Sequence, residues 1–316
     1  MRILFYGSPD YTCVFLDALS ACAEVIGVIT AADKKSGRGQ ITHRPAPARW
    51  AEERNIPLFQ SPDLRDARFA EALRELRPDL GVVVAYGRIL PRAVFAIPPR
   101  ETINVHFSLL PEHRGASPIE SALLAGARVS GVSVQRIVEE LDAGDVLASS
   151  EVIIDPDDHY PELFAKLMDA ALALLPRCIE SIQAGSARYT PQDAKKVSFC
   201  GKIGTDTRRI NWHNDAERVY NQIRAYSGVR TAWTTLRGKK ILLHRVQASA
   251  EEEPPGRDRA RDGESGTIVS HSGKVFVFCG DRRYVSLAEV QMENKRRVPA
   301  AECFNGLRLQ PGECFE

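Results

Sequence analysis

Three polar side chains in the first half of the chain could together carry out an acyl transfer. Asn104 and His106 lie two residues apart in an alternating, β-rich segment, so both project from the same face of one strand. Asp142 follows the next predicted strand, in the turn Leu-Asp-Ala-Gly-Asp. An amide, an imidazole and a carboxylate can serve such a reaction as hydrogen-bond donor, general acid or base, and orienting group.

The alternative is that these side chains are structural. A single histidine such as His106 in an α/β core is more often a hydrogen-bonded structural residue than a catalyst. Three observations favour catalysis: the face shared with Asn104, the Ser-Leu-Leu-Pro turn that follows the strand, and the later Asp142. Ligands bind at strand ends of open α/β sheets, which is where these residues are expected.

Alternating strand-like and helix-like segments predict an α/β catalytic domain over residues 1–185, with a Rossmann-like, mostly parallel sheet covered on both faces. The predicted strands are Arg2–Phe5, Val25–Thr30, Leu80–Val84, Thr102–His106, Gly131–Ile137 and Val146–Ile154. The predicted helices are Val14–Ala23, Ala46–Arg54, Ala67–Leu76, Pro118–Ala125 and Pro161–Ala184.

The rest of the chain has a different pattern. Residues 186–205 are polar, without hydrophobic periodicity, and are expected to form a linker. Closely spaced short segments then predict a small β-barrel of the oligonucleotide-binding (OB) type over residues 206–316. Its expected strands are Ala232–Leu236, Lys240–Val246, Gly266–Ser270, Val275–Cys279 and Arg283–Val290. The segment 251–265 is acidic, then basic, with two prolines, and is predicted to be a disordered loop.

Composition and charge limit the class of protein. The chain has 316 residues, 44% of them hydrophobic and 26% charged, as in ordinary soluble proteins. No apolar run is long enough for a membrane span, and seven scattered cysteines without a Cys-x-x-Cys indicate reduced thiols. We therefore expect a cytoplasmic protein with no metal site. Residues 1–187 carry a net charge of −6 and residues 188–316 a net charge of +7, which favours a polyanionic partner for the second half.

One long motif resembles a known family. The run Asn-x-His-x-Ser-Leu-Leu-Pro-x-x-Arg-Gly-x-x-Pro from Asn104, followed by Leu-Asp-x-Gly-Asp, is similar to formyltransferases that use 10-formyltetrahydrofolate. The resemblance implies that Asn104, His106 and Asp142 are the catalytic trio. It also implies a folate-binding set: Tyr86, Gly87, Ile89, Leu90, Ser108, Leu109, Leu110 and Pro111.

Other segments resemble the branch of this family that acts on initiator tRNA. Ser36-Gly37-Arg38-Gly39 is similar to an inserted loop that reaches the tRNA acceptor end, although such glycine-rich loops are often only mobile surface. Similar matches lie at 194–196, 209–212, 238–240 and 295–297. The tRNA contacts that the resemblance implies are Lys34, Lys35, Arg38, Lys195, Lys196, Lys239, Lys240 and Arg296.

The expected function is formyl transfer from 10-formyltetrahydrofolate, a co-substrate, to the amino group of methionyl initiator tRNA, by a monomer without membrane contact. The open alternatives within the family are transfer to an amino-sugar nucleotide, transfer to a glycinamide ribonucleotide, or hydrolysis of the formyl donor. A nicotinamide dehydrogenase is disfavoured because the first turn, Gly7-Ser8-Pro9-Asp10, lacks G-x-G-x-x-G. A non-enzymatic RNA-binding protein leaves the trio unexplained.

Three residues depart from the family pattern. Phe107 stands where a small residue or proline is expected, Glu120 where glutamine is usual, and Asn211 where an acid often precedes tryptophan. None of them belongs to the trio, so the predicted chemistry is unaffected.

Overall fold

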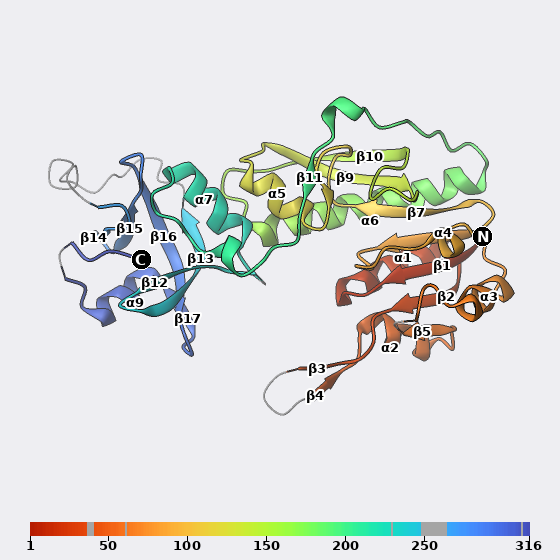
Figure 1. The fold of residues 1–316 in the computed structure, drawn as a ribbon, viewed down its shortest axis with the longest axis horizontal. Coiled ribbons are helices and arrows are strands. Elements are labelled where there is room, and N and C mark those ends of the chain that lie inside the picture. Colours follow the sequence, from red (N-terminus) through yellow and green to blue (C-terminus); the bar gives the residue numbers. More distant parts are fainter. Residues whose placement is uncertain (37–40, 61, 229, 248–263, 311) are drawn as a thin grey trace. The chain divides into compact units, whose positions relative to one another are not determined.

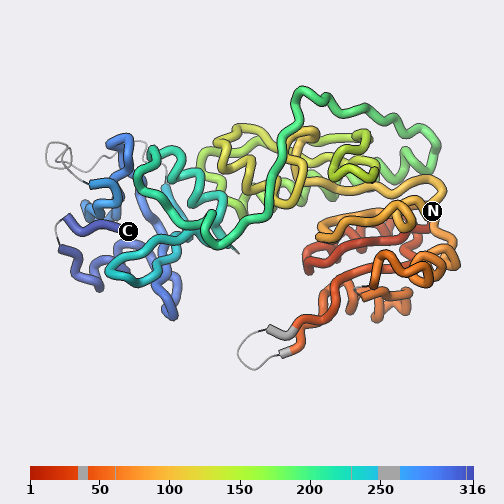
Figure 2. Tube along the Cα trace, viewed as in Figure 1, coloured from red at the N-terminus to blue at the C-terminus, as the bar shows by residue number. Residues whose placement is uncertain are grey.

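The computed structural model describes residues 1–36, 41–60, 62–228, 230–247, 264–310 and 312–316 (Figures 1 and 2). The chain forms two compact units that do not follow chain order. The first unit comprises Met1–Ala116, Gly131–Val152 and Leu167–Cys200, and the second comprises Ser117–Ser130, Ile153–Lys166 and Gly201–Glu316. Within the described residues, no helix is both long and apolar enough to cross a membrane.

A seven-stranded sheet forms the centre of the first unit, in the order β10-β9-β7-β6-β1-β2-β5. The pairs from β7 through β6, β1 and β2 to β5 are parallel, and β9 is antiparallel to β7. Its strands are β1 Arg2–Gly7, β2 Glu24–Thr30, β5 Leu58–Gln60, β6 Leu80–Val84, β7 Glu101–His106, β9 Val129–Arg136 and β10 Val146–Ile153. The mostly parallel α/β prediction is confirmed.

Both faces of this sheet are covered, as the continuous apolar strands predict. The successive side chains Ile3, Leu4, Phe5 and Tyr6 of β1 point to alternate faces and are all fully buried. The helices with residues in this unit are α1 Cys13–Cys22, α2 Ala46–Glu53, α3 Ala67–Glu75, α4 Arg92–Phe95 and α6 Tyr160–Gln183. The predicted strands and helices of the α/β region agree with the structure to within about two residues.

Two short paired strands lie on either side of the segment that is predicted to reach the tRNA (Figure 1). Strand β3, Lys34–Ser36, pairs antiparallel with β4, Ile41–His43. The predicted contact Arg38 lies outside the described residues, as does the side chain of Lys35. Helix α2 follows these two strands in the chain.

An antiparallel sheet forms the second unit, in the order β12-β13-β16-β15-β14, with β17 paired to β16. Its strands are β12 Ala232–Leu236, β13 Lys239–Gln247, β14 Ile268–His271, β15 Lys274–Phe278, β16 Tyr284–Met292 and β17 Arg297–Pro299. All five predicted strands are present, which confirms a small β-rich C-terminal region. Most of the predicted disordered loop, residues 251–263, lies outside the described residues.

Two helices of the second unit were missed by the sequence reading. They are α7, Ala216–Ala225, and α9, Ala300–Leu307. Helix α7 begins at Asp215, whose carboxylate accepts a hydrogen bond from the backbone N–H of Arg218, and it buries Val219 and Ile223. This N-cap and apolar spacing were readable signals. Helix α5, Pro118–Leu124, packs against α7, so residues distant in sequence build this unit.

The predicted linker contains ordered structure. The 3-10 turns η2, Ala194–Lys196, and η3, Asp206–Arg208, lie on either side of strand β11, Phe199–Cys200. Strand β11 pairs in parallel with β8, Arg114–Gly115, in the turn after β7. A two-residue strand is too short to produce hydrophobic periodicity, which is why the pattern indicated only a polar connection.

Candidate active site

Strand β7 places Asn104 and His106 on one face, and β9 adds two polar partners to it. In the antiparallel register, Asn104 lies opposite Gln135 and His106 lies opposite Ser133. Directly opposed residues of neighbouring strands project to the same side. His106 is buried and Asn104 is half-buried. A cluster of polar side chains therefore lies at the carboxyl end of a central strand, as predicted from the sequence.

The imidazole of His106 is oriented by a backbone carbonyl. Its Nε2 lies 3.0 Å from the carbonyl oxygen of His113. Because a carbonyl can only accept, the hydrogen bond requires a proton on Nε2. The other ring nitrogen, Nδ1, lies 3.8 Å from Oδ2 of Asp142, which is beyond hydrogen-bonding distance. The His113 carbonyl thus fixes the ring, and the Nδ1 edge faces the carboxylate.

The carboxylate of Asp142 has two other donors. Its Oδ2 accepts from the backbone N–H of Gly115 at 2.9 Å, and its Oδ1 accepts from Nε2 of Gln135 at 3.0 Å. The backbone of Asp142 has a φ of 51°, an uncommon value for a residue with a side chain. A Cβ at Gly144 would lie 1.8 Å from the carbonyl oxygen of Arg136, so the Asp-x-Gly spacing is a steric requirement.

The turn between β7 and β8 is closed by its own hydrogen bonds. The hydroxyl of Ser108 donates to the carbonyl of Glu112 at 2.6 Å. Ser133 of β9 accepts from the N–H of Leu110 at 3.0 Å and donates to the carbonyl of Ser108 at 2.8 Å. The Leu110–Pro111 peptide is cis. The predicted sharp turn is present and is tied to the neighbouring strand.

The supposed linker completes this turn, a feature the sequence reading missed. Ser198 Oγ accepts from the N–H of His113 at 2.9 Å, and its carbonyl accepts from the N–H of Arg114 at 2.9 Å. The thiol of Cys200 donates to the carbonyl of His113 at 3.2 Å, the same carbonyl that holds His106. Burial lowers the pKa of His113; neighbouring Glu112 opposes that change and His106 adds to it.

The residues expected to bind folate lie after two adjacent parallel strands, β6 and β7. Ile89 is 75% exposed, whereas Leu90 is buried in the core cluster with Leu4 and Val94. Tyr86 is buried edge-to-face against Tyr6, with ring centroids 5.8 Å apart. The remaining members are Gly87, which has a φ of 79°, buried Ser108 and Pro111, and half-buried Leu109 and Leu110.

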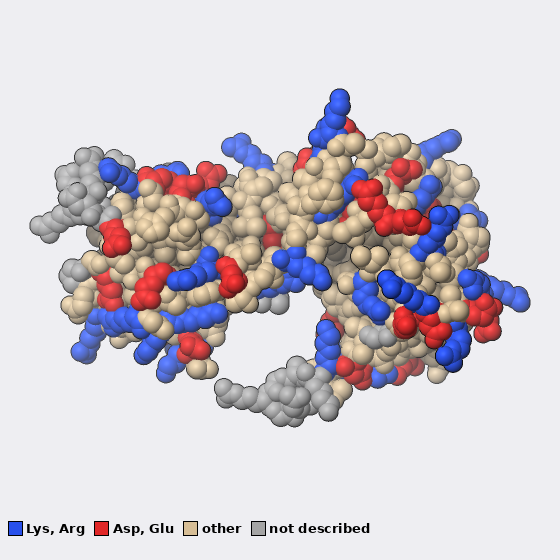
Figure 3. Space-filling view, viewed as in Figure 1, with Lys and Arg blue, Asp and Glu red and all other residues tan. Residues whose placement is uncertain are grey.

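The residues expected to bind tRNA are divided between the two units. Lys34, Lys195 and Lys196 are exposed in the first unit. In the second, Lys239 is exposed, Nζ of Lys240 lies 4.4 Å from the ring centroid of Trp233, and Arg296 pairs with Glu302 at 3.2 Å. Figure 3 shows lysine and arginine side chains gathered along the edge of the second unit that carries α9, β12 and β17.

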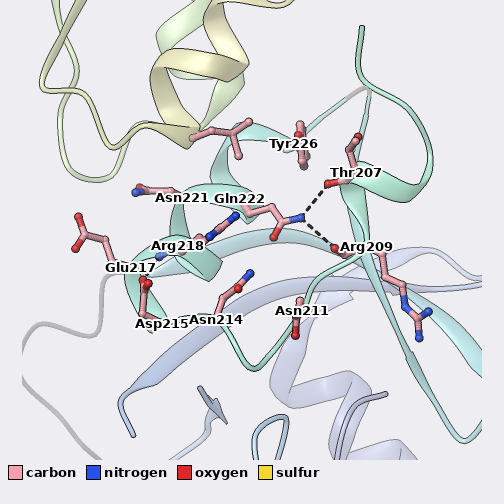
Figure 4. A pocket seen from close by; sticks show the side chains of 11 residues that line it. Thr207, Arg209, Asn211, Asn214, Asp215, Glu217, Arg218, Asn221, Gln222 and Tyr226 are labelled. Carbon is pink, nitrogen blue, oxygen red and sulfur yellow. Dashed lines mark hydrogen bonds between the residues drawn. The ribbon is translucent and has the colours of Figure 1, made fainter. Parts of the chain in front are cut away.

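The second unit also contains a polar cavity of about 610 Å³ beside α7 (Figure 4). Nε2 of Gln222 spans part of its wall, donating to the carbonyls of Thr207 and Arg209 at 3.0 Å each. The other lining residues are Leu124, Asn211, Asn214, Asp215, Glu217, Arg218, Asn221 and Tyr226. No member of the trio lines it. Across the residues that the structure describes, no group of three or more His, Cys, Asp or Glu is arranged to hold a metal ion.

The three residues that depart from the motif have different surroundings. Phe107, the residue after His106, is buried. Glu120 of α5 is buried with its carboxylate 3.6 Å from the guanidinium of Arg230. Burial raises the pKa of Glu120, while a backbone hydrogen bond and Arg230 oppose the change. Asn211 accepts from the N–H of His213, which closes a turn before α7.

A mostly parallel sheet with an Asn-His-Asp group at the end of one strand is consistent with an acyl-transferring enzyme. Two family models match the chain. Residues 1–179 match the formyl transferase model, and residues 202–308 match the model described as formyl transferase, C-terminal domain. The chain belongs to the formyl transferase family.

Full-length relatives narrow the family further. The methionyl-tRNA formyltransferases of Leptospira interrogans and Sulfurihydrogenibium sp. are 35% and 36% identical to this chain, with complete coverage of both sequences. The Streptomyces coelicolor methionyl-tRNA formyltransferase is 36% identical and covers 99% of each sequence. At this identity and coverage, the chain belongs to the methionyl-tRNA formyltransferase family.

Solved structures share the fold at lower identity. An N-formyltransferase from Helicobacter canadensis, in complex with folinic acid and dTDP-3-aminofucose, superimposes with a TM-score of 0.66 at 16% identity, covering 93% of this chain and 100% of that one. HypX from Aquifex aeolicus, in complex with tetrahydrofolic acid, gives 0.63 at 19% identity, covering 99% of this chain and 48% of that one. These likenesses concern the fold alone.

Proposed function

We propose that this protein transfers the formyl group of 10-formyltetrahydrofolate to the free amino group of methionyl initiator tRNA, as a step in translation initiation. The observation that carries the proposal is the Asn104, His106 and Asp142 group at the end of β7. It occurs in a chain that matches methionyl-tRNA formyltransferases over its whole length. Asn104, His106 and Asp142 are assigned as the catalytic residues.

The chemistry requires a neutral amine and a polarised formyl carbonyl. The amine nitrogen adds to the formyl carbon, which gives a tetrahedral intermediate with an oxyanion, and the bond from that carbon to the folate nitrogen then breaks. The amine loses one proton and the folate nitrogen gains one. Free α-amino groups have a pKa of about 7.7–8.0, so only a weak base is needed. The amide of Asn104 supplies a donor for the developing oxyanion, an interaction typically worth about 3–4 kcal/mol.

His106 and Asp142 are the two groups placed to handle the proton. The Nε2 of His106 is engaged by the His113 carbonyl, so its Nδ1 is the ring atom that faces the reaction. Asp142 lies across from that atom, and its carboxylate already accepts from Gly115 and Gln135. An amine that approaches this pair would therefore find two acceptors, Nδ1 of His106 and Oδ2 of Asp142.

The proposed folate contacts lie in the first region of the chain, whereas the proposed tRNA contacts come from both regions. Residues 1–185 form the catalytic domain, with folate contacts drawn from Tyr86–Pro91 and Ser108–Pro111. Residues 186–205 connect it to a tRNA-binding domain over 206–316. The phosphate contacts are Lys34, Lys35, Arg38, Lys195, Lys196, Lys239, Lys240 and Arg296. The exposure of most of these cations and the net charge of +7 over 188–316 support a salt-sensitive contact with the tRNA backbone. The protein acts as a cytoplasmic monomer, away from membranes, and requires no metal.

The test is an assay of formyl transfer from 10-formyltetrahydrofolate with three acceptors: methionyl initiator tRNA, an amino-sugar nucleotide, and water. Rapid transfer to the tRNA alone is the expected result. Transfer to the sugar would identify a sugar N-formyltransferase, and release of formate would identify a hydrolase. Either of these outcomes would retain the catalytic residues and overturn the proposed acceptor.

A further inference from the structure

The side chain of Gln192 forms hydrogen bonds with the backbone of the turn that contains Asp142. It lies 50 residues further along the chain, in the polar connection between the two predicted domains. Its Nε2 donates to the carbonyls of Asp142 at 2.8 Å and Gly144 at 2.7 Å, and lies 3.2 Å from Oε1 of Gln135. We infer that Gln192 is a positioning residue, which sets where the Asp142 carboxylate stands relative to His106. The inference rests on the proposed formyl transfer.

Arg114 fixes the orientation of the Gln192 amide. Its Nε and Nη2 lie 3.1 and 2.9 Å from Oε1 of Gln192. A guanidinium can only donate, so the amide oxygen must face Arg114, and the amide nitrogen must face the two turn carbonyls and Oε1 of Gln135. Arg114 is itself buried, and its Nη1 donates to Glu140 at 2.9 Å.

The side chain of Gln135 connects Gln192 to the Asp142 carboxylate. Because Oε1 of Gln135 faces the N–H group of Gln192, the Nε2 of Gln135 is directed towards Asp142 Oδ1 at 3.0 Å. Gln135 is only 2% exposed, so a flipped amide would leave buried polar groups unpaired. Gln192 therefore acts on Asp142 twice, through the backbone of its turn and through Gln135.

The backbone of this turn needs such support. The two carbonyls that accept from Gln192 belong to Asp142 itself, with its φ of 51°, and to Gly144. A residue held in an uncommon backbone conformation persists only when its surroundings determine it. Without the Gln192 amide, the turn loses hydrogen bonds at both of these residues, and the separation of Asp142 Oδ2 from His106 Nδ1 is no longer set.

The expected effect falls on turnover. A misplacement of about 1 Å in an active site can cost roughly 100-fold in rate. We expect Gln192→Ala to lower kcat by about 10- to 100-fold, while KM for both substrates changes less than about 2-fold. As a matched control, Gln183→Ala removes an exposed glutamine at the end of α6 and should leave kcat unchanged.

A double-mutant cycle with Asp142→Asn separates positioning from a general loss of structure. If Gln192 acts through Asp142, adding Gln192→Ala to Asp142→Asn should lower single-turnover transfer by less than about 2-fold further. Equal losses in both backgrounds would overturn the inference. So would a change confined to KM.

A second variant guards against misfolding. Gln192→Glu keeps the size of the side chain and the acceptor that faces Arg114, but it presents an acceptor to the two carbonyls. Its activity relative to the parent enzyme should rise as the pH falls, since protonation restores one donor. A ratio that does not change with pH would contradict the assignment.

The two proposals fail in different ways. If the acceptor were not methionyl initiator tRNA, the parent enzyme would fail to formylate it, and the cycle would be repeated with the sugar nucleotide or with water. Failure of the Gln192 inference appears in the Gln192 variants, as additivity with Asp142→Asn, a change confined to KM or a pH-independent ratio, in a parent enzyme that is fully active.

Discussion

The polar groups of the candidate active site in the first unit and the cations of the second unit are held in opposite ways. His106 and Asp142 are largely enclosed, and each has a named backbone or amide partner that fixes its position. Lys239 and Arg296 are exposed, and Arg296 pairs with an exposed glutamate, Glu302. Chemistry requires atoms placed to within a few tenths of an ångström, whereas binding a phosphate backbone requires mainly positive charge.

We therefore expect variants of the first region to change turnover and variants of the second region to change the affinity for tRNA. Substitutions around β7 should lower turnover without changing the salt dependence of tRNA binding. Substitutions of the exposed cations proposed to bind tRNA should weaken binding, most strongly at low salt, and leave the chemical step intact.

His106→Ala should have the largest effect. General acid–base groups typically contribute about 10²- to 10⁴-fold, so kcat should fall by roughly that factor. Because His106 is buried and faces Asp142, the Kd for tRNA should remain within about 2-fold. Single-turnover transfer and filter binding would measure the two constants. A large loss of affinity would instead give His106 a role in binding tRNA.

Joint replacement of Lys239 and Lys240 by alanine should raise the Kd for tRNA by about 10-fold at moderate salt. The slope of log Kd against log salt should fall by about 1 per lost phosphate contact. The single-turnover rate at saturating tRNA should not change. Arg65→Ala, which removes an exposed arginine of the first unit, is the matched control. An unchanged salt slope would refute the assigned contact.

Point variants are preferable here to removal of residues 206–316. Helix α5 lies within the first 185 residues but packs against α7. Truncation would expose the face of α5 that this contact buries, and a loss of activity would then have two causes.

Arg38→Ala tests whether the first unit also contributes charge to tRNA binding. We expect KM for methionyl-tRNA to rise about 3- to 10-fold, the size typical of one lost hydrogen bond, with KM for the folate unchanged. Steady-state kinetics with each substrate varied in turn would measure this. Equal changes in both constants would instead assign the loop to general folding of the site.

Glu120→Gln should give the smallest effect, on stability alone. Burial raises the pKa of Glu120 in the folded protein, so its ionised form costs stability. The folded state then retains a proton that the unfolded state loses, and stability falls as the pH rises above the ordinary glutamate range. The variant should flatten that decline, and at neutral pH it should be more stable by less than about 1 kcal/mol, because the facing Arg230 is half exposed.

Denaturant unfolding between acidic and neutral pH would measure this difference. A variant that is less stable than the parent at neutral pH would show that the pair with Arg230 outweighs the cost of burial. The cation would then have a structural role that Lys239 does not have.

Whether an element could be predicted from the sequence depended on how many residues showed its apolar spacing. Strands such as β6 and helices such as α6 contain enough residues for their apolar spacing to be read directly. Helix α7 also had such a signal, an Asp215 cap before spaced apolar residues, and could have been found. Strand β11 could not, because two residues carry no period.

The sequence by itself determined the α/β order of the first half, the β-rich second half, and the common face of Asn104 and His106, because each of these follows from local periodicity. It also determined the opposite charges of the two halves. Only the tertiary structure decided that the His113 carbonyl, rather than Asp142, fixes the His106 ring. The structure alone also brought Gln192 to the Asp142 turn. A backbone carbonyl has no side-chain signature, and a partner 50 residues away is specified by packing rather than by any local pattern.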